Sequence, residues 1–167
     1  MKRAKVSFEK IRSKQAMRRN LNQKEGVELL TNNYIGHLGY ISGSSPHIVP
    51  ITYYYDEATH TITSYSSEGH KIDAMRKTPL VCLCVDEISS VANWESVLIH
   101  GTFEELSGID AKHMLRQFSD GVKRIINKIP TKNTQFISEF SAKIEKEKTP
   151  LVFRITIDEI TGKKRES

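Results

Sequence analysis

The sequence predicts a mainly β fold with helices, in which a small antiparallel barrel of about six strands has helices at its ends. Short β-rich segments follow one another with turn residues between them, and they do not alternate regularly with helices as in a doubly wound sheet. The count of about six strands suits a compact barrel. A chain of 167 residues is also long enough to form one domain with a real core.

The first part of the chain has the pattern of one helix and three strands. In order, these are a short amphipathic helix over 20–33 and strands over Tyr34–Ile41, His47–Tyr55 and Thr61–Tyr65. A turn over 42–46 separates the first two strands. Pro50 lies inside the second strand, which predicts a sheet edge or a bulge there, where backbone donors are free.

The second part of the chain has a different order. We expect a short helix near 70–77 that stops at Thr78-Pro79, then a strand over Leu80–Asp86 and a polar connection over Asp86–Asn93. Trp94–Leu106 is expected to form one long strand or two joined at Gly101. Helices over 107–129 and 134–147, a strand over Leu151–Ile157 and a turn over Ile160–Lys164 complete the order. The apolar residues of the two long helices recur on one face, so both are expected to pack on the barrel or on a partner.

Charge is unevenly distributed along the chain. Residues 1–19 hold eight Lys or Arg and one acid, a net +7 of the total +5, which leaves −2 for the other 148 residues. Such an arm either binds nucleic acid or an anionic membrane, or is a solvated terminus, and the second interpretation is the commoner. The body has no basic stripe with interleaved aromatics, so we expect no nucleic-acid partner. We also expect the arm to be dispensable for cofactor binding.

No apolar run in the sequence approaches the roughly 20 residues of a membrane span, and the N-terminus has no apolar signal core. These observations predict a cytoplasmic protein with no membrane partner. Cys82 and Cys84 are two residues apart on one strand, so their side chains face the same side. We expect them to be reduced core thiols. No G-x-S-x-G, P-loop or metal-ligand spacing occurs, so the sequence indicates neither a catalytic residue nor a metal site.

The segment Ser66–Arg76 carries the strongest local signal. It places hydroxyls, Gly69, His70 and Lys71 where a strand gives way to a helix. The start of a helix offers unpaired N–H groups and the positive end of the dipole, which suit a phosphate. A capped helix with solvated basic residues explains the same letters, and the local chemistry leaves both interpretations open.

Six segments in order extend this signal beyond one motif. They are Gly36–Gly39, Pro46–Tyr53, Gly69–Arg76, Pro79–Asp86, Trp94–Val97 with Gly101, and Ile157–Lys163. Over about residues 22–163 the chain resembles the pyridoxamine 5′-phosphate oxidase-like superfamily of flavin-binding split barrels, nearest to the nitroimidazole-resistance-type branch. The resemblance implies a six-stranded antiparallel split barrel over 20–163, between the basic arm over 1–19 and a tail over 164–167.

The same resemblance implies FMN at a homodimer interface, with heme or deazaflavin as alternatives because related barrels host them. It places the phosphate on His70 and Lys71. The other implied contacts are a flavin-facing strand (Val49, Pro50, Ile51, Thr52), the strand before the helix (Ser64, Tyr65, Ser66) and a partner contact (Trp94, Ser96). Pro50 would leave neighbouring backbone groups free to meet the isoalloxazine edge.

Two departures narrow the implied activity. Ser64-Tyr65-Ser66 stands where many relatives have His-Ser-Ala, which argues against nitro-group reduction. The C-terminal Trp/Arg segment of vitamin B6 oxidases is absent, since the only Trp is Trp94. Two hypotheses remain: an FMN-dependent oxidoreductase acting on a small molecule or a redox protein, and a non-catalytic flavin- or heme-binding module that senses or stores.

Overall fold

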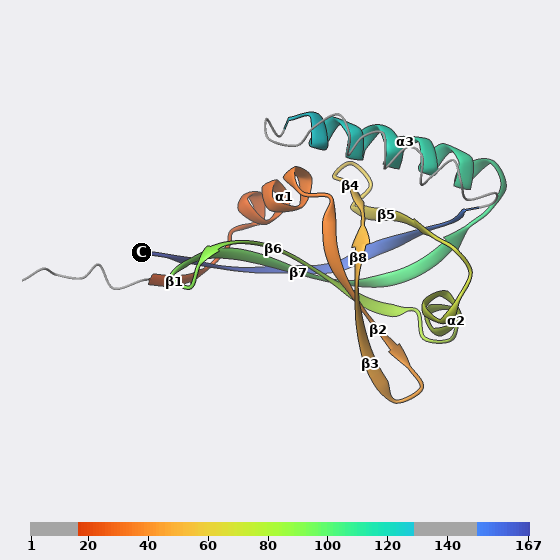
Figure 1. Ribbon diagram of the computed structural model, residues 1–167, viewed down its shortest axis with the longest axis horizontal. Coiled ribbons are helices and arrows are strands. Elements are labelled where there is room, and N and C mark those ends of the chain that lie inside the picture. The colour runs from red at the N-terminus through yellow and green to blue at the C-terminus, as the bar shows by residue number, and fades with distance from the viewer. Residues whose placement is uncertain (1–16, 129–149) are drawn as a thin grey trace, which may run out of the picture.

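The computed structural model describes residues 17–128 and 150–167. Three helices and eight strands make up this part of the chain (Figure 1). In chain order they are β1 (Met17–Asn20), α1 (Gln23–Asn32), β2 (Ile35–Ser42), β3 (Ser45–Thr52), β4 (Tyr54–Asp56), β5 (Thr61–Ser66), α2 (His70–Lys77), β6 (Leu80–Ser90), β7 (Asn93–Leu106), α3 (Gly108–Asn127) and β8 (Leu151–Glu166).

All strands belong to one antiparallel sheet in the order β3-β2-β6-β7-β8-β5-β4, with β1 added beside β8. The sheet is open, because β3 and β4 at its two ends follow each other in the chain without pairing. Tyr53 is the break: its N–H donates to Tyr34 O at 2.8 Å and its buried hydroxyl donates to Leu30 O at 2.9 Å. The predicted antiparallel split barrel with helices is confirmed.

The structure corrects several boundaries within that fold. Eight strands are described where about six were expected, partly because the predicted strand His47–Tyr55 splits at Tyr53 into β3 and β4. The predicted polar connection Asp86–Asn93 is wrong, since β6 and β7 continue as a hairpin almost to its tip. The predicted turn over Ile160–Lys164 is also wrong, because those residues pair with β7.

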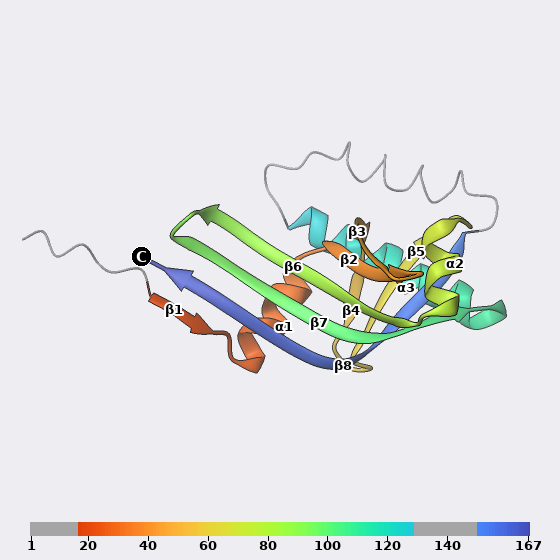
Figure 2. The same cartoon turned by 90° about the horizontal axis from the view of Figure 1, so that it is seen from below.

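The long strands β6, β7 and β8 run side by side and project at one end, where β1 joins them (Figure 2). Met17–Arg19, the last residues of the predicted basic arm, are therefore part of the sheet. Lys164–Glu166, predicted as a tail, are the end of β8. The pairing of β1 with β8 supplies the backbone partners that fix both segments.

A register shift opposite His100 and Gly101, where β8 has Asp158 as an extra residue, makes a bulge in the β7–β8 pairing, and β7 continues as one strand. A side chain at Gly101 would collide with the carbonyl of Thr156 on β8, so the close approach of the two backbones requires glycine. The bulge carries the sheet from its projecting end into the curved part that holds the core.

The core lies on the concave face, where α1 and α2 cover the sheet. Its fully buried side chains include Leu30, Leu38, Tyr53, Ile62, Ile72, Met75, Leu83, Ile99, Phe153 and Ile155. Cys82 and Cys84 are free thiols, but the prediction that they are core residues is wrong. They are half-buried and alternate with the buried Val81, Leu83 and Val85, so they face the opposite, outer side of the sheet.

Helix α3 covers β4 and β5 (Figure 1). Its buried Phe118, Val122 and Ile126 match the apolar face expected for 107–129. The expected helix over 134–147 lies outside the described residues. Among the described residues, no helix has the length and apolar character needed to cross a bilayer.

Candidate functional site

A cavity of about 500 Å³ opens between the end of β3, the end of β5 and the beginning of α2. Its lining residues are Ile35, Pro50, Ile51, Thr52, Tyr65, Ser66, Ser67, Glu68, Gly69, His70 and Lys71. The lining is mostly polar and the volume is within the range of small-molecule sites. The strand-to-helix motif found in the sequence thus forms one wall of a cavity, and the strand that contains Pro50 forms the other.

Strand β3 is an edge of the sheet, as Pro50 predicts. It pairs with β2 on one side, with Pro50 opposite His37 and Thr52 opposite Ile35. Pro50 is exposed and has no N–H to donate, which suits a strand that has a neighbour on one side only. Backbone groups on the other side of β3 therefore face the cavity or the gap toward β5.

Ser64 links the two walls of the cavity. The residue is 1% exposed, and its hydroxyl donates to Thr52 O at 2.7 Å. The hydrogen bond joins β5 to the end of β3 across the split in the barrel. Ser64 does not line the cavity, and its hydroxyl is already used, so its effect on the site is to hold the edge strand in place.

Helix α2 begins beside the cavity with no side chain capping it. Its N-cap is Gly69, with φ 155° and ψ −176°, a conformation that residues with a Cβ rarely adopt. The first intrahelical bond runs from Asp73 N–H to Gly69 O, so the N–H groups of the first turn have no acceptor within the helix. Together with the half-buried Lys71, they give this wall a positive potential.

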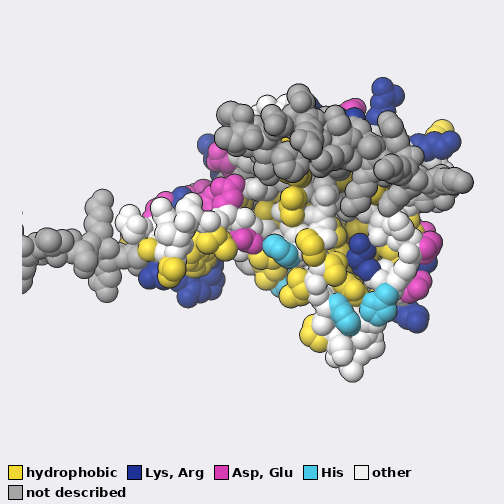
Figure 3. All heavy atoms as spheres, viewed as in Figure 1, with side chains coloured by type: hydrophobic (Ala, Val, Ile, Leu, Met, Phe, Trp, Pro, Cys, Tyr) yellow, Lys and Arg dark blue, Asp and Glu magenta, His cyan; other side chains and the backbone are white. Residues whose placement is uncertain are grey.

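His70 is at the cavity, but its ring is engaged elsewhere. Its Nε2 is hydrogen-bonded with Ser42 Oγ at 3.0 Å, and its ring packs edge-on against His47 at 5.3 Å. His47 in turn stacks on Tyr40. Histidine side chains gather where the β2–β3 hairpin approaches α2 (Figure 3). In this geometry His70 ties the hairpin to the helix, and its backbone N–H is the group at the start of α2.

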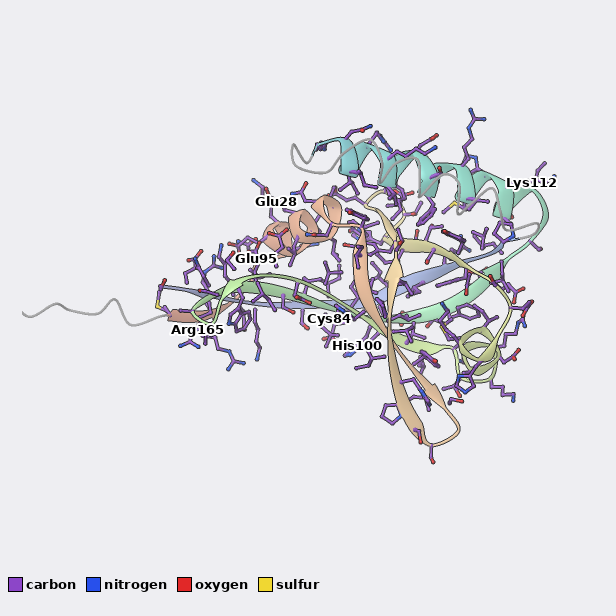
Figure 4. The ribbon with its side chains drawn as sticks, in the orientation of Figure 1. Glu28, Cys84, Glu95, His100, Lys112 and Arg165 are labelled. Carbon is purple, nitrogen blue, oxygen red and sulfur yellow. The ribbon has the colours of Figure 1, made fainter. Side chains whose placement is uncertain are left out.

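Trp94 and Ser96, both on β7, do not line this cavity. Trp94 is paired with Arg165 of β8 and with Ile88 of β6 at the projecting end, and Ser96 Oγ is 3.5 Å from Cys84 Sγ. Figure 4 shows Arg165 and Glu95 at the projecting end and α2 at the other. Within one chain, these two predicted contacts are not part of the site.

Seven of the eleven predicted site residues therefore line one cavity: Pro50, Ile51, Thr52, Tyr65, Ser66, His70 and Lys71. Val49 is half-buried and packs against the core beside them. The predicted site residues do not include the other four lining residues, Ile35, Ser67, Glu68 and Gly69, although Ser67 and Gly69 belong to the strand-to-helix motif. The hairpin register could have indicated Ile35, which lies opposite Thr52. No sequence signal favours Glu68, because an acid is the wrong sign for a phosphate site.

A second cavity, of about 440 Å³, lies on the outer face of the sheet. It is mostly apolar, and Ile41, Ile48 and Leu80 around it are exposed by 36%, 73% and 67%. Within residues 17–128 and 150–167, no three His, Cys, Asp or Glu side chains are grouped so as to hold a metal ion.

The sequence profile of the family described as pyridoxamine 5′-phosphate oxidase matches residues 22–164, the whole of the split barrel. The chain belongs to the pyridoxamine 5′-phosphate oxidase family. The resemblance seen in the sequence is therefore confirmed at the level of the family. The matched range contains both walls of the polar cavity and also the projecting end that carries Trp94.

Solved structures share this fold. An FAD-binding protein of Mesorhizobium loti is 27% identical, with 92% of this chain and 100% of that chain aligned at a TM-score of 0.69. A proposed 5-nitroimidazole antibiotic resistance protein of Bacteroides thetaiotaomicron is 16% identical, with 90% and 91% aligned at a TM-score of 0.63, which shows the fold alone. An uncharacterised protein of Rhizobium meliloti (strain 1021) is 30% identical over 95 residues, 57% of this chain and 62% of its own length.

Proposed function

We propose that this member of the pyridoxamine 5′-phosphate oxidase family binds a flavin in the cavity between β3, β5 and α2. The observation that carries the proposal is the cavity itself, which brings an edge strand and an uncapped helix start to one place. The name of the 27% identical M. loti protein, which binds FAD, supports a flavin over other ligands. Heme and deazaflavin remain the alternatives.

We propose FMN as the flavin, with its phosphate at the start of α2. The donors there are the first-turn N–H groups and the Lys71 ammonium. Ser66 and Ser67 stand beside them, although the Ser66 hydroxyl now donates to Ser67 O at 3.0 Å. The isoalloxazine edge would lie along Pro50–Thr52, where only backbone groups not already used can bond it. Thr52 O is one that is used, by Ser64.

FAD has a second phosphate and an adenosine that the proposal for FMN does not place. The absorption spectrum of the purified protein and the mass of the ligand released from it distinguish these ligands. A flavin absorbs near 450 nm and heme near 400 nm, and mass spectrometry of the released ligand separates FMN from FAD. A colourless protein that takes up none of these ligands would contradict the proposal.

We further propose that the protein is an oxidoreductase acting on a small molecule or a redox protein. When bound, a flavin supplies hydride or electron transfer, and the chain's own residues bind and orient it. The non-catalytic module that senses or stores is the second function. Anaerobic titration with NADH and NADPH tests whether a donor reduces the bound flavin. Addition of an electron acceptor then separates the two functions, because only an enzyme must pass the electrons on at a useful rate.

We propose a homodimer, with the outer face of β2, β3 and β6 as its contact. Exposed Ile35, Ile41, Ile48, Leu80 and Ile88 follow one face of these strands. Contiguous exposed apolar side chains of this kind mark interfaces. Light scattering should give about twice the chain mass of 19.0 kDa. A monomer that still holds flavin would contradict it. A cytoplasmic location remains a prediction.

A further inference from the structure

Arg76, on the last turn of α2, holds three carboxylates. Its Nη1 and Nη2 donate to the two oxygens of Glu68, both at 2.8 Å. Its Nε and Nη2 donate to the two oxygens of Glu105 on β7, at 2.8 and 3.0 Å. Its Nη1 also donates to Asp73 Oδ1 at 3.4 Å. The guanidinium thus clamps the loop before α2 to the end of β7.

Glu68 is an unexpected residue at an anion site. It directly precedes the N-cap Gly69, and it lines the cavity in which Lys71 and the first-turn N–H groups lie. A carboxylate next to a helix N-terminus is attracted by the same N–H groups and dipole that attract a phosphate. A free Glu68 side chain would therefore compete with a phosphate for those donors and repel it by its charge.

The Arg76 clamp pulls this carboxylate the other way. Its guanidinium also bonds Asp73 and Glu105, and neither of these residues nor Arg76 lines the cavity. The Glu68 carboxylate is therefore held on the side of the helix that faces the end of β7. Glu105 holds the same guanidinium from the sheet, so the arginine cannot easily follow Glu68 back toward the cavity.

We propose that Arg76 is a positioning residue that keeps the Glu68 carboxylate away from the phosphate donors at the start of α2. This inference rests on the proposed flavin site and explains how an anion site tolerates an acid in its wall. The bond with Arg76 also lowers the pKa of Glu68, so Glu68 stays ionised and paired at neutral pH. Lysine could not replace arginine, because one ammonium cannot make two bidentate bonds.

The test compares FMN with riboflavin, which lacks the phosphate, on the full chain. Arg76→Ala should weaken FMN binding about 10-fold and leave riboflavin within about twofold. Adding Glu68→Gln to Arg76→Ala should restore FMN binding, because the released side chain no longer carries a charge. Fluorescence titration measures all of these affinities.

Glu105→Gln tests the anchor of this clamp at a carboxylate that does not line the cavity. It removes the charged partner that holds the guanidinium on the sheet side, so it should weaken FMN binding less than Arg76→Ala does and leave riboflavin binding near the wild-type value. Arg76→Lys, which keeps a cation, should lie between wild type and Arg76→Ala for FMN. Thermal unfolding of each apo variant reports whether the fold is intact.

Three results would overturn the inference: equal weakening of FMN and riboflavin by Arg76→Ala, failure of Glu68→Gln to restore FMN binding, or loss of folding in both Arg76 variants with or without Glu68→Gln. Each would mean that Arg76 is structural. A wild-type protein that binds neither ligand, or binds both equally, would instead refute the proposed phosphate site itself.

Discussion

The two ends of the long sheet differ in how completely one chain builds them. At the α2 end, an edge strand, a buried cross-link from Ser64 and an uncapped helix start enclose a polar cavity. At the projecting end, β6, β7 and β8 form a ribbon with exposed Ile88 and Val91, and the half-buried Trp94 lines only a smaller polar cavity of about 300 Å³ beside β8. We propose that the α2 end is a binding site formed within one chain, whereas the projecting end acts only against a partner.

This difference indicates how the predicted contacts can belong to one site. Trp94 and Ser96 do not line the cavity of their own chain. The family resemblance implies that they are a partner contact, and we propose that a second copy packed on the outer face brings its Trp94 and Ser96 to that cavity. The comparison therefore separates residues that act within a chain from residues that would act across a dimer.

Lys71→Ala, at the α2 end, should have the largest effect on FMN binding. Loss of a charge-assisted hydrogen bond to the phosphate, roughly 1.5–3 kcal/mol, corresponds to about 10- to 150-fold weaker FMN binding. Riboflavin should bind the variant and the wild type alike. Lys77→Ala, a cation at the opposite end of the same helix, is the matched control and should change neither affinity. Equal weakening of both ligands by Lys71→Ala would place the phosphate elsewhere.

Trp94→Ala tests the projecting end. If Trp94 contacts the flavin of the partner, its truncation should weaken FMN binding about 10-fold, as for an interface aromatic. The single variant does not distinguish a direct contact with the partner's flavin from an indirect effect on the fold. A mixture of two variants makes that distinction.

A heterodimer of Lys71→Ala and Trp94→Ala chains holds one site with both residues intact and one with both changed. Mixing the two variants under conditions that allow exchange should therefore restore tight binding to about half of the sites in each heterodimer. If the mixture binds no better than the separate variants, Trp94 does not act across a dimer.

Ser64→Ala should have a smaller effect, on stability as well as on the site. The change removes the bond to Thr52 O across the split and should lower the free energy of unfolding by about 1 kcal/mol. Ser66→Ala is the control, since its hydroxyl bond is exposed and local. Urea unfolding monitored by circular dichroism measures both. An unchanged midpoint for Ser64→Ala would show that the split is held by packing alone.

The sequence predicts the α2 end better than the projecting end, for a physical reason. Ser66–Lys71 and Pro50–Thr52 are contiguous segments, and their patterns are a turn before a helix and a proline in a strand. These patterns depend on neighbours in the sequence, so they can be recognised without knowing the tertiary structure. Cys82 and Cys84 were assigned to the wrong face, because an apolar run such as Val81–Val85 does not show which side is buried. The turn predicted over Ile160–Lys164 is wrong because these residues pair with β7, and Gly162 permits close packing against Leu21.

The ion pair at the projecting end should give the smallest effect, and only in acid. Arg19 of β1 donates to both oxygens of Glu25, and with the Asn22 N–H it lowers the pKa of Glu25 to about 2 from 4.5. A carboxyl with a lowered pKa in the folded state contributes stability above about pH 4.5, and this contribution is lost as the pH falls toward 2. The gap in melting temperature between wild type and Glu25→Gln should therefore be present at pH 6 and shrink steadily below pH 4.5. Glu28→Gln, on the same helix and exposed, is the control and should show no such convergence. A gap that stays constant from pH 6 to pH 3 would mean that β1 is held by its backbone pairing with β8 and not by this ion pair.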